Sequence, residues 1–319
     1  MAGKRSTLLH SAAFLLLCVL SAIAALRADL FPNLSTPLPG IEKQALTLGL
    51  LALAAITIAA IRRISLPSPS RRVAALWIAV GFALFTFPAV LSILTERMAP
   101  GSSTAVLSTL VPVFAVVLEP HFSETQRQPR PLALPAALVS LYGSLQIFPF
   151  ALPNSLPGAL ALLADVLSAF LIATGLCLGA RAAATGPQHS LLPGTAIAAG
   201  SAALSLLILG TILQPSALHS IVPATLLTEA LWSALIGAPA AALLFWLLPR
   251  LSPVHLSTRI TLSLAAGTLF EILSFGAASL LKSRTGLGLV LMAAGAAYLL
   301  LPYSKRMDQT GPIPIPDAE

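Results

Sequence analysis

Long apolar runs separated by short polar segments recur along the whole 319-residue chain. A helix needs about 20 apolar residues to cross the roughly 30 Å hydrocarbon core of a bilayer. The runs are continuous rather than alternating, which argues against a transmembrane β-barrel. We therefore predict an all-α integral membrane protein with ten spans: Leu8–Leu26, Ala45–Ile61, Val73–Leu94, Ser103–Leu118, Leu132–Phe148, Ala159–Ala180, Leu191–Leu213, Leu231–Leu248, Ile260–Leu281 and Leu287–Leu301.

The composition narrows the class of protein further. Hydrophobic residues make up 57% of the chain and charged residues only 9%, whereas about a quarter of a soluble domain is charged. This excludes a soluble enzyme, a disordered chain and a disulfide scaffold. The net charge of +7 is attributed to loop cations that orient the spans, not to nucleic-acid binding. Cys18 and Cys177 lie inside apolar runs and are expected to be small core residues.

Lysine and arginine placement predicts the orientation. With the N-terminus inside, 13 of the 18 cations, Arg259 included, fall in cytoplasmic segments and 5 outside. The positive-inside rule then places both termini in the cytoplasm, with the chain in the cytoplasmic (inner) membrane. The first span has an open alternative, because Lys4, Arg5 and the later Ala22-Ile23-Ala24 are also typical of a cleaved signal peptide. Cleavage would not change the orientation of the other nine spans.

An internal repeat organises these spans. Arg97-Met98-Ala99-Pro100 returns as Arg250-Leu251-Ser252-Pro253, an offset of 250 − 97 = 153, and the same offset carries the first five spans onto the last five. Because five is odd, the halves must be inverted in the membrane, an architecture found in secondary transporters. We predict repeats over residues 1–150 and 151–307, joined at Pro149–Gly158, and a disordered Pro-rich tail over 308–319.

Several motifs carry a resemblance to a known family. The first half carries three such motifs, Phe82–Phe87 (FALFTF), Met98–Ala105 (MAPGSSTA) and Leu110–Ala115 (LVPVFA), and the acidic Glu124 follows them. The second half carries two, Phe245–Pro253 and Gly286–Leu301. Over residues 8 to 303 the chain resembles the EamA-like branch of the drug/metabolite transporter superfamily. It departs from that pattern in the ninth helix, where Ala265 to Phe270 replace a proline and Lys282-Ser283 stand near the usual acid. The resemblance implies ten helices, cytoplasmic termini, and import or efflux of small metabolites, amino acids or drugs.

Ionisable groups inside spans are costly in lipid and are candidates for function. Glu271 is about 11 residues into the ninth span, roughly 17 Å deep, and is a candidate proton or substrate carrier or a buried neutral acid. Asp165 is about six residues into the sixth span and either faces an outward vestibule or snorkels to the surface. Glu229 and Glu119 stand at span ends, where we expect them to be solvated.

Neutral side chains add further candidates. Gln146 and Tyr142 are four residues apart and share one face of the fifth span, so both could line a solute pathway. Three prolines inside spans should kink their helices and are candidate hinges: Pro88, Pro112 and Pro239. Three tryptophans near span ends are expected to be membrane-interface residues: Trp77, Trp232 and Trp246.

No catalytic or cofactor motif accompanies these features. The sequence has no phosphate-binding loop, His-Glu-x-x-His or Cys-x-x-Cys, so we predict neither an enzyme nor a bound cofactor or metal. The function predicted is secondary transport of a small organic, apolar or amphipathic solute by alternating access, with proton coupling through Glu271 as a hypothesis. The alternatives are a flippase for a lipid or lipid-linked carrier, a non-transporting scaffold and, less favoured, a membrane enzyme; a homodimer also stays open.

Overall fold

The fold was analysed in a computed structural model that describes residues 2–26, 40–62, 70–98, 104–122, 131–148, 150, 153–185, 191–213, 223–274 and 283–301. Within these ranges the chain is helical and contains no strand, as predicted. The first half holds α1 (Ala2–Ala25), α3 (Gly40–Ile61), α4 (Arg71–Gly81), η2 (Phe82–Thr86), α5 (Phe87–Met98), α6 (Thr104–Ser108), α7 (Leu110–Phe122) and α8 (Ala133–Ile147). The second holds α9 (Leu156–Thr185), α10 (Leu191–Leu213), α12 (Pro223–Trp232), η4 (Ser233–Gly237), α13 (Ala238–Leu247), α14 (Pro253–Ser274) and α15 (Ser283–Leu300).

Seven helical segments of the described chain are long and apolar enough to cross a membrane. Three further apolar helices are shorter: Val106–Phe122, Ala133–Ile147 and Arg284–Leu300. Large apolar side chains are exposed along the bundle, among them Leu53, Leu163 and Leu204 at 61–63%. A water-soluble protein rarely leaves so much apolar surface uncovered, so the fold is compatible with a multi-pass membrane protein.

Each predicted span overlaps a helix, but four helices begin five to eight residues before the predicted position. The eighth helix starts at Pro223 rather than Leu231, and α14 starts at Pro253 rather than Ile260. The physical reason at α14 is local: the Ser252 hydroxyl accepts the His255 backbone N–H at 3.2 Å, and proline is favoured in a first turn. The prediction ends spans at charged residues, whereas Glu229 lies inside α12 and Arg259 lies inside α14.

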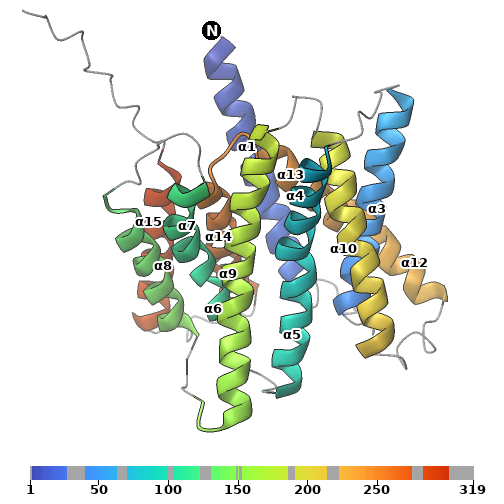
Figure 1. The fold of residues 1–319 in the computed structure, drawn as a ribbon. Coiled ribbons are helices and arrows are strands. Elements are labelled where there is room, and N and C mark those ends of the chain that lie inside the picture. The colour runs from blue at the N-terminus through green and yellow to red at the C-terminus, as the bar shows by residue number, and fades with distance from the viewer. Residues whose placement is uncertain are drawn as a thin grey trace, which may run out of the picture.

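The helices pack in pairs that join the two halves (Figure 1). α3 packs against α10 at one side of the bundle, and α8 packs against α15 at the other. Between them α9 contacts α4, α5 and α7, while α1 contacts α13 and α14. These contacts run between helices of the first and second halves of the chain, so the two halves form one bundle.

The core lies where α4, α9, α10 and α13 meet. Trp77 is fully buried there, beside Gly194 of α10 and with its ring centroid 6.2 Å from that of Phe245. This contradicts the expectation that Trp77 lies at the membrane interface: the absence of a side chain at Gly194 leaves room for the indole inside the bundle. Cys177 is buried and Cys18 partly buried, and both are free thiols, as expected of small packing residues.

Candidate functional site

A pocket of about 610 Å³ lies between the two halves of the chain. This volume is within the range of small-molecule sites. Its walls come from the end of α1, the start of α3, the π-helical turns η2 and η4, and α12, α13 and α14: Ala24, Ala25, Gly40, Lys43, Gln44, Thr47, Leu48, Phe85, Glu229, Trp232, Ser233, Gly237, Ala240, Ala241, Leu244 and Arg259. Small residues contribute much of this wall, which explains why space remains where these seven helical segments meet.

Both π-helical turns contribute to the wall, and each is followed by a proline. The Phe87 N–H bonds to Phe82 O, and the Ala238 N–H bonds to Ser233 O, both five residues back. The next residues are Pro88 and Pro239, which have no N–H and whose rings would clash with the carbonyl four residues earlier. A wider π-turn relieves that clash, so the prolines distort their helices as predicted, and π-turns are frequent at functional sites. A hinge role for these prolines remains a prediction.

Each π-turn is also joined to a helix of the other half by a pair of hydroxyls. The Thr47 and Ser233 oxygens are 3.1 Å apart, linking α3 to η4. The Thr86 and Ser205 oxygens are 2.9 Å apart, linking η2 to α10. Ser233 and Thr86 are buried, where a lost hydrogen bond would not be replaced by water. Each link therefore joins a helix of one half of the chain to the π-turn of the other half.

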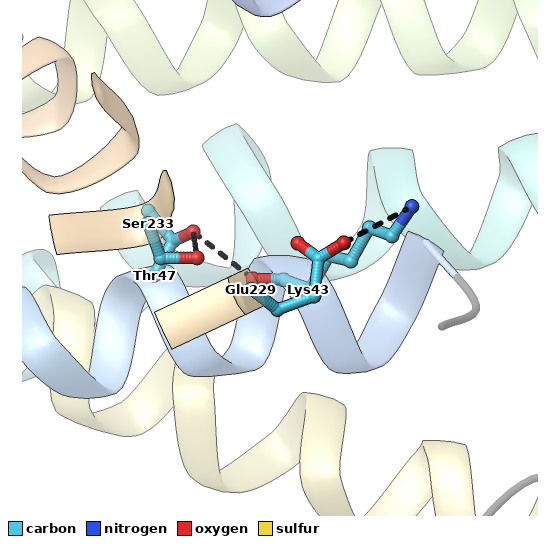
Figure 2. Close-up of polar contacts among 4 residues, drawn as sticks. All are labelled: Lys43, Thr47, Glu229 and Ser233. Carbon is cyan, nitrogen blue, oxygen red and sulfur yellow. Dashed lines mark hydrogen bonds and ion pairs between the residues drawn. The ribbon is translucent and has the colours of Figure 1, made fainter. Parts of the chain in front are cut away.

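An ion pair stands one turn away from the first of these links (Figure 2). Lys43 Nζ is 3.7 Å from Glu229 Oε1, and Thr47 and Ser233 follow four residues later on the same two helices. The Lys43 side chain is 34% exposed and that of Glu229 only 1%. The expectation that Glu229 is solvated is therefore wrong, because α12 carries it into the bundle beside α3. Glu119 is likewise buried, at 8%, on α7.

Arg259 reaches the pocket from the opposite end of the bundle. It is the seventh residue of α14, about 9 Å from that helix's first residue at 1.5 Å per residue. Its side chain is partly accessible, and it is one of the residues lining the pocket. The assignment of Arg259 to a loop is therefore wrong.

Glu271 is placed away from this pocket. It is exposed in the last turn of α14, which is described to Ser274, and it is absent from the pocket wall. The predicted depth assumed that the helix starts at Ile260, but the helix starts seven residues earlier, which moves Glu271 toward its far end.

Asp165 is buried, at 4%, on α9, and does not line the pocket. The Thr95 hydroxyl donates to its Oδ1 at 3.0 Å and also lies 3.4 Å from the Ala161 carbonyl. This contact joins α5 to α9, which belong to different halves. Asp165 thus neither snorkels to the surface nor faces the pocket, and its observed contact is a link between helices.

Gln146 and Tyr142 both lie on α8, which packs on the opposite side of the bundle from α3 (Figure 1), and neither residue lines the pocket. Tyr142 is 55% exposed, and Gln146 is partly buried next to α15 at Gly288. Pro112 is the third residue of α7, just after a break at Thr109, whose hydroxyl bonds to Ser144 at 2.9 Å. None of the four predicted pathway residues, Glu271, Asp165, Gln146 and Tyr142, lines the pocket.

The pocket residues that the sequence reasoning missed are its charged and hydroxyl groups. On sequence alone, Lys43, Glu229 and Arg259 mark the ends of spans. A signal was present: Ser252-Pro253 is a helix-start sequence, and starting the ninth helix there would have placed Arg259 within it. In the described part of the chain, no three histidine, cysteine or acidic residues are arranged to hold a metal ion.

Comparisons with known proteins inform the fold alone. No family model matches the chain, and no curated protein matches it significantly. A solved structure described only as "Crystal structure of protein" is similar to it, with a TM-score of 0.70 and 18% sequence identity. The alignment covers 90% of this chain and 95% of that one. The chain is therefore similar over nearly its whole length to a fold that has been solved.

Proposed function

We propose that the chain is a secondary transporter that moves a small organic solute across the membrane by alternating access. One observation carries the proposal: a pocket of about 610 Å³ is lined by both halves of the chain and by the π-turn of each half. Transporters built from two repeats bind solute at the interface between the repeats, commonly where helices are interrupted. The resemblance to the EamA-like branch supports the same class.

The pattern of helix packing supports an inverted repeat of five plus five helices. Exchanging the halves maps the α1–α14 contact onto α9–α7, and the α1–α13 contact onto α9–α5. The α3–α10, α8–α15 and α7–α14 pairs map onto themselves. The π-turns begin at Phe82 and Ser233, an offset of 151 that agrees with the 153 of the Arg-x-x-Pro repeat. We infer that the three shorter apolar helices are the fourth, fifth and tenth spans of this arrangement: Val106–Phe122, Ala133–Ile147 and Arg284–Leu300.

Alternating access would use the interrupted helices. The pocket lies where α1 ends and α3 begins, and it extends along the eighth helix from Glu229 to Leu244, roughly 20 Å at 1.5 Å per residue. A π-turn interrupts the regular hydrogen bonding of a helix, so the segments on either side can change their angle at low cost. We propose that bending at η2 and η4 closes the pocket at this end and opens it at the other.

Solute flux in sealed vesicles tests this proposal. Purified protein is reconstituted, loaded with a mixed metabolite pool, and compared with empty vesicles by mass spectrometry. Ala240→Leu narrows the pocket, whereas Ala242→Leu changes a residue of the same helix that does not line it. We expect a solute to move with the native protein and with Ala242→Leu, and to slow with Ala240→Leu.

The same vesicles address the alternatives. If no solute moves, transport of metabolites is wrong, and a fluorescent lipid added to one leaflet then reports whether the protein is a flippase. If neither a solute nor a lipid moves, the scaffold alternative holds. If Ala240→Leu and Ala242→Leu transport the solute equally well, the pocket is not the pathway.

A further inference from the structure

Arg259 has no protein partner within the described chain, which distinguishes it from Arg97 and Arg250. Arg97 donates to the Leu213 carbonyl at 2.8 Å, and Arg250 donates to the Trp246 carbonyl and stacks on the Trp246 ring. Within the part of the chain that the structure describes, Arg259 makes no hydrogen bond or ion pair, although it lies in a helix apolar enough to span a membrane. Its guanidinium carries five N–H donors that something must satisfy.

The charges of the pocket wall do not cancel. The ionisable residues that line it are Lys43, Glu229 and Arg259, which sum to one positive charge at neutral pH. Lys43 and Glu229 already neutralise each other at 3.7 Å, which leaves the excess charge on Arg259. A cation inside a membrane-spanning segment is costly unless a counter-charge accompanies it. An anion entering the pocket would supply that counter-charge.

The rest of the wall limits what else the anion carries. Leu48, Phe85 and Leu244 offer apolar surface, while Gln44 and Ser233 are neutral polar groups. A dianion would leave a net negative charge in the pocket, and an inorganic ion would leave this apolar wall uncovered. A carboxylate matches the planar guanidinium with two parallel hydrogen bonds.

We propose that the pocket binds an amphipathic organic monocarboxylate, with its carboxylate on Arg259 and its apolar part against Phe85, Leu48 and Leu244. This inference rests on the proposed function and names the class of solute that is carried. Arg259 is thus a substrate-binding residue, and the Lys43–Glu229 pair leaves it as the pocket's single uncompensated charge.

Binding to protein in lipid nanodiscs tests the proposal without requiring transport. Titration calorimetry compares four acids with their uncharged amides of nearly equal shape: benzoate, octanoate, indoleacetate and naphthaleneacetate. Protein-free nanodiscs correct for partition into lipid. We expect at least one acid to bind about tenfold or more tightly than its amide, because a charge-assisted hydrogen bond accounts for that difference.

Variants then assign the preference to Arg259. Arg259→Gln should abolish the preference for the acid, Arg259→Lys should keep part of it, and Arg250→Gln, an arginine that does not line the pocket, should leave it unchanged. Thermal stability gives a second readout: without solute, Arg259→Gln should be at least as stable as the native protein, since it removes an uncompensated charge. A stability loss confined to Arg259→Gln would instead show a structural role and overturn the proposal.

The outcomes separate this inference from the proposed function. If every acid binds no better than its amide, the anion site is wrong, while flux of a neutral solute would still support a transporter. If an acid binds through Arg259 but does not cross the membrane, the site is right and transport is wrong. The comparison of acid with amide uses the native protein, so it decides the question even if Arg259→Gln does not fold.

Discussion

A close contact between α8 and α15 offers a sharp test of the packing of the bundle. α8 and α15 approach each other at glycines: a Cβ atom added at Gly288 would lie 2.6 Å from the Gly143 carbonyl oxygen and from Ile147 Cγ1. Ordinary contacts of this kind are 3.4–4 Å. The carbonyl belongs to the backbone and cannot rotate away. Gly288→Ala therefore forces the two helices apart by about 3.4 − 2.6 = 0.8 Å at this point.

The cost of that separation can be isolated with a second glycine of the same helix. Gly286 has no atom within 4 Å of an added Cβ. In both variants alanine gains about 1 kcal/mol of helix propensity over glycine, and this gain cancels when the two are compared. What remains is the overpacking cost at Gly288, typically about 1–3 kcal/mol. We expect Gly288→Ala to be less stable than Gly286→Ala by that amount.

Unfolding in mixed micelles measures the difference. Helicity is followed by circular dichroism as a denaturing detergent replaces a mild one, and the free energies of unfolding of the two variants are compared. Equal stability of the two variants would refute the close approach of α8 and α15. If Gly143→Ala lowers the free energy of unfolding as much as Gly288→Ala does, that result supports the same contact from the α8 side.

Three further predictions concern the site. Thr86→Val should lower the free energy of unfolding by about 1 kcal/mol, because it breaks the buried bond to Ser205, whereas exposed Thr211→Val should leave it unchanged in the same assay. Pro239→Ala restores a backbone donor and lets η4 return to α-helical bonding, so vesicle flux should slow without loss of thermal stability; unchanged flux would contradict the hinge. Glu271→Gln should not alter flux at any pH, since Glu271 is exposed and outside the pocket, and a changed pH profile would revive the proton-coupling hypothesis.

Much of the fold follows from hydropathy along the chain. Continuous apolar runs indicated every helix, because backbone groups in hydrocarbon must bond within their own segment. Leu191–Leu213 was predicted to the residue, since Pro and polar residues bound it on both sides. Pro88 and Pro239 marked the places where helices are distorted, because the lost N–H and the ring clash are local effects.

The tertiary structure decided which polar groups meet. A charge in the sequence is equally consistent with a loop and with a pocket wall, and only its neighbours distinguish the two, as Arg259 and Glu229 show. Trp77 has the sequence surroundings of an interface residue, yet Gly194, 117 positions away, makes room for it in the core. Hydropathy is a property of the chain in one dimension, so it fixes where helices form. The face that each helix turns to its neighbours, to lipid or to a solute depends on contacts between segments far apart in sequence.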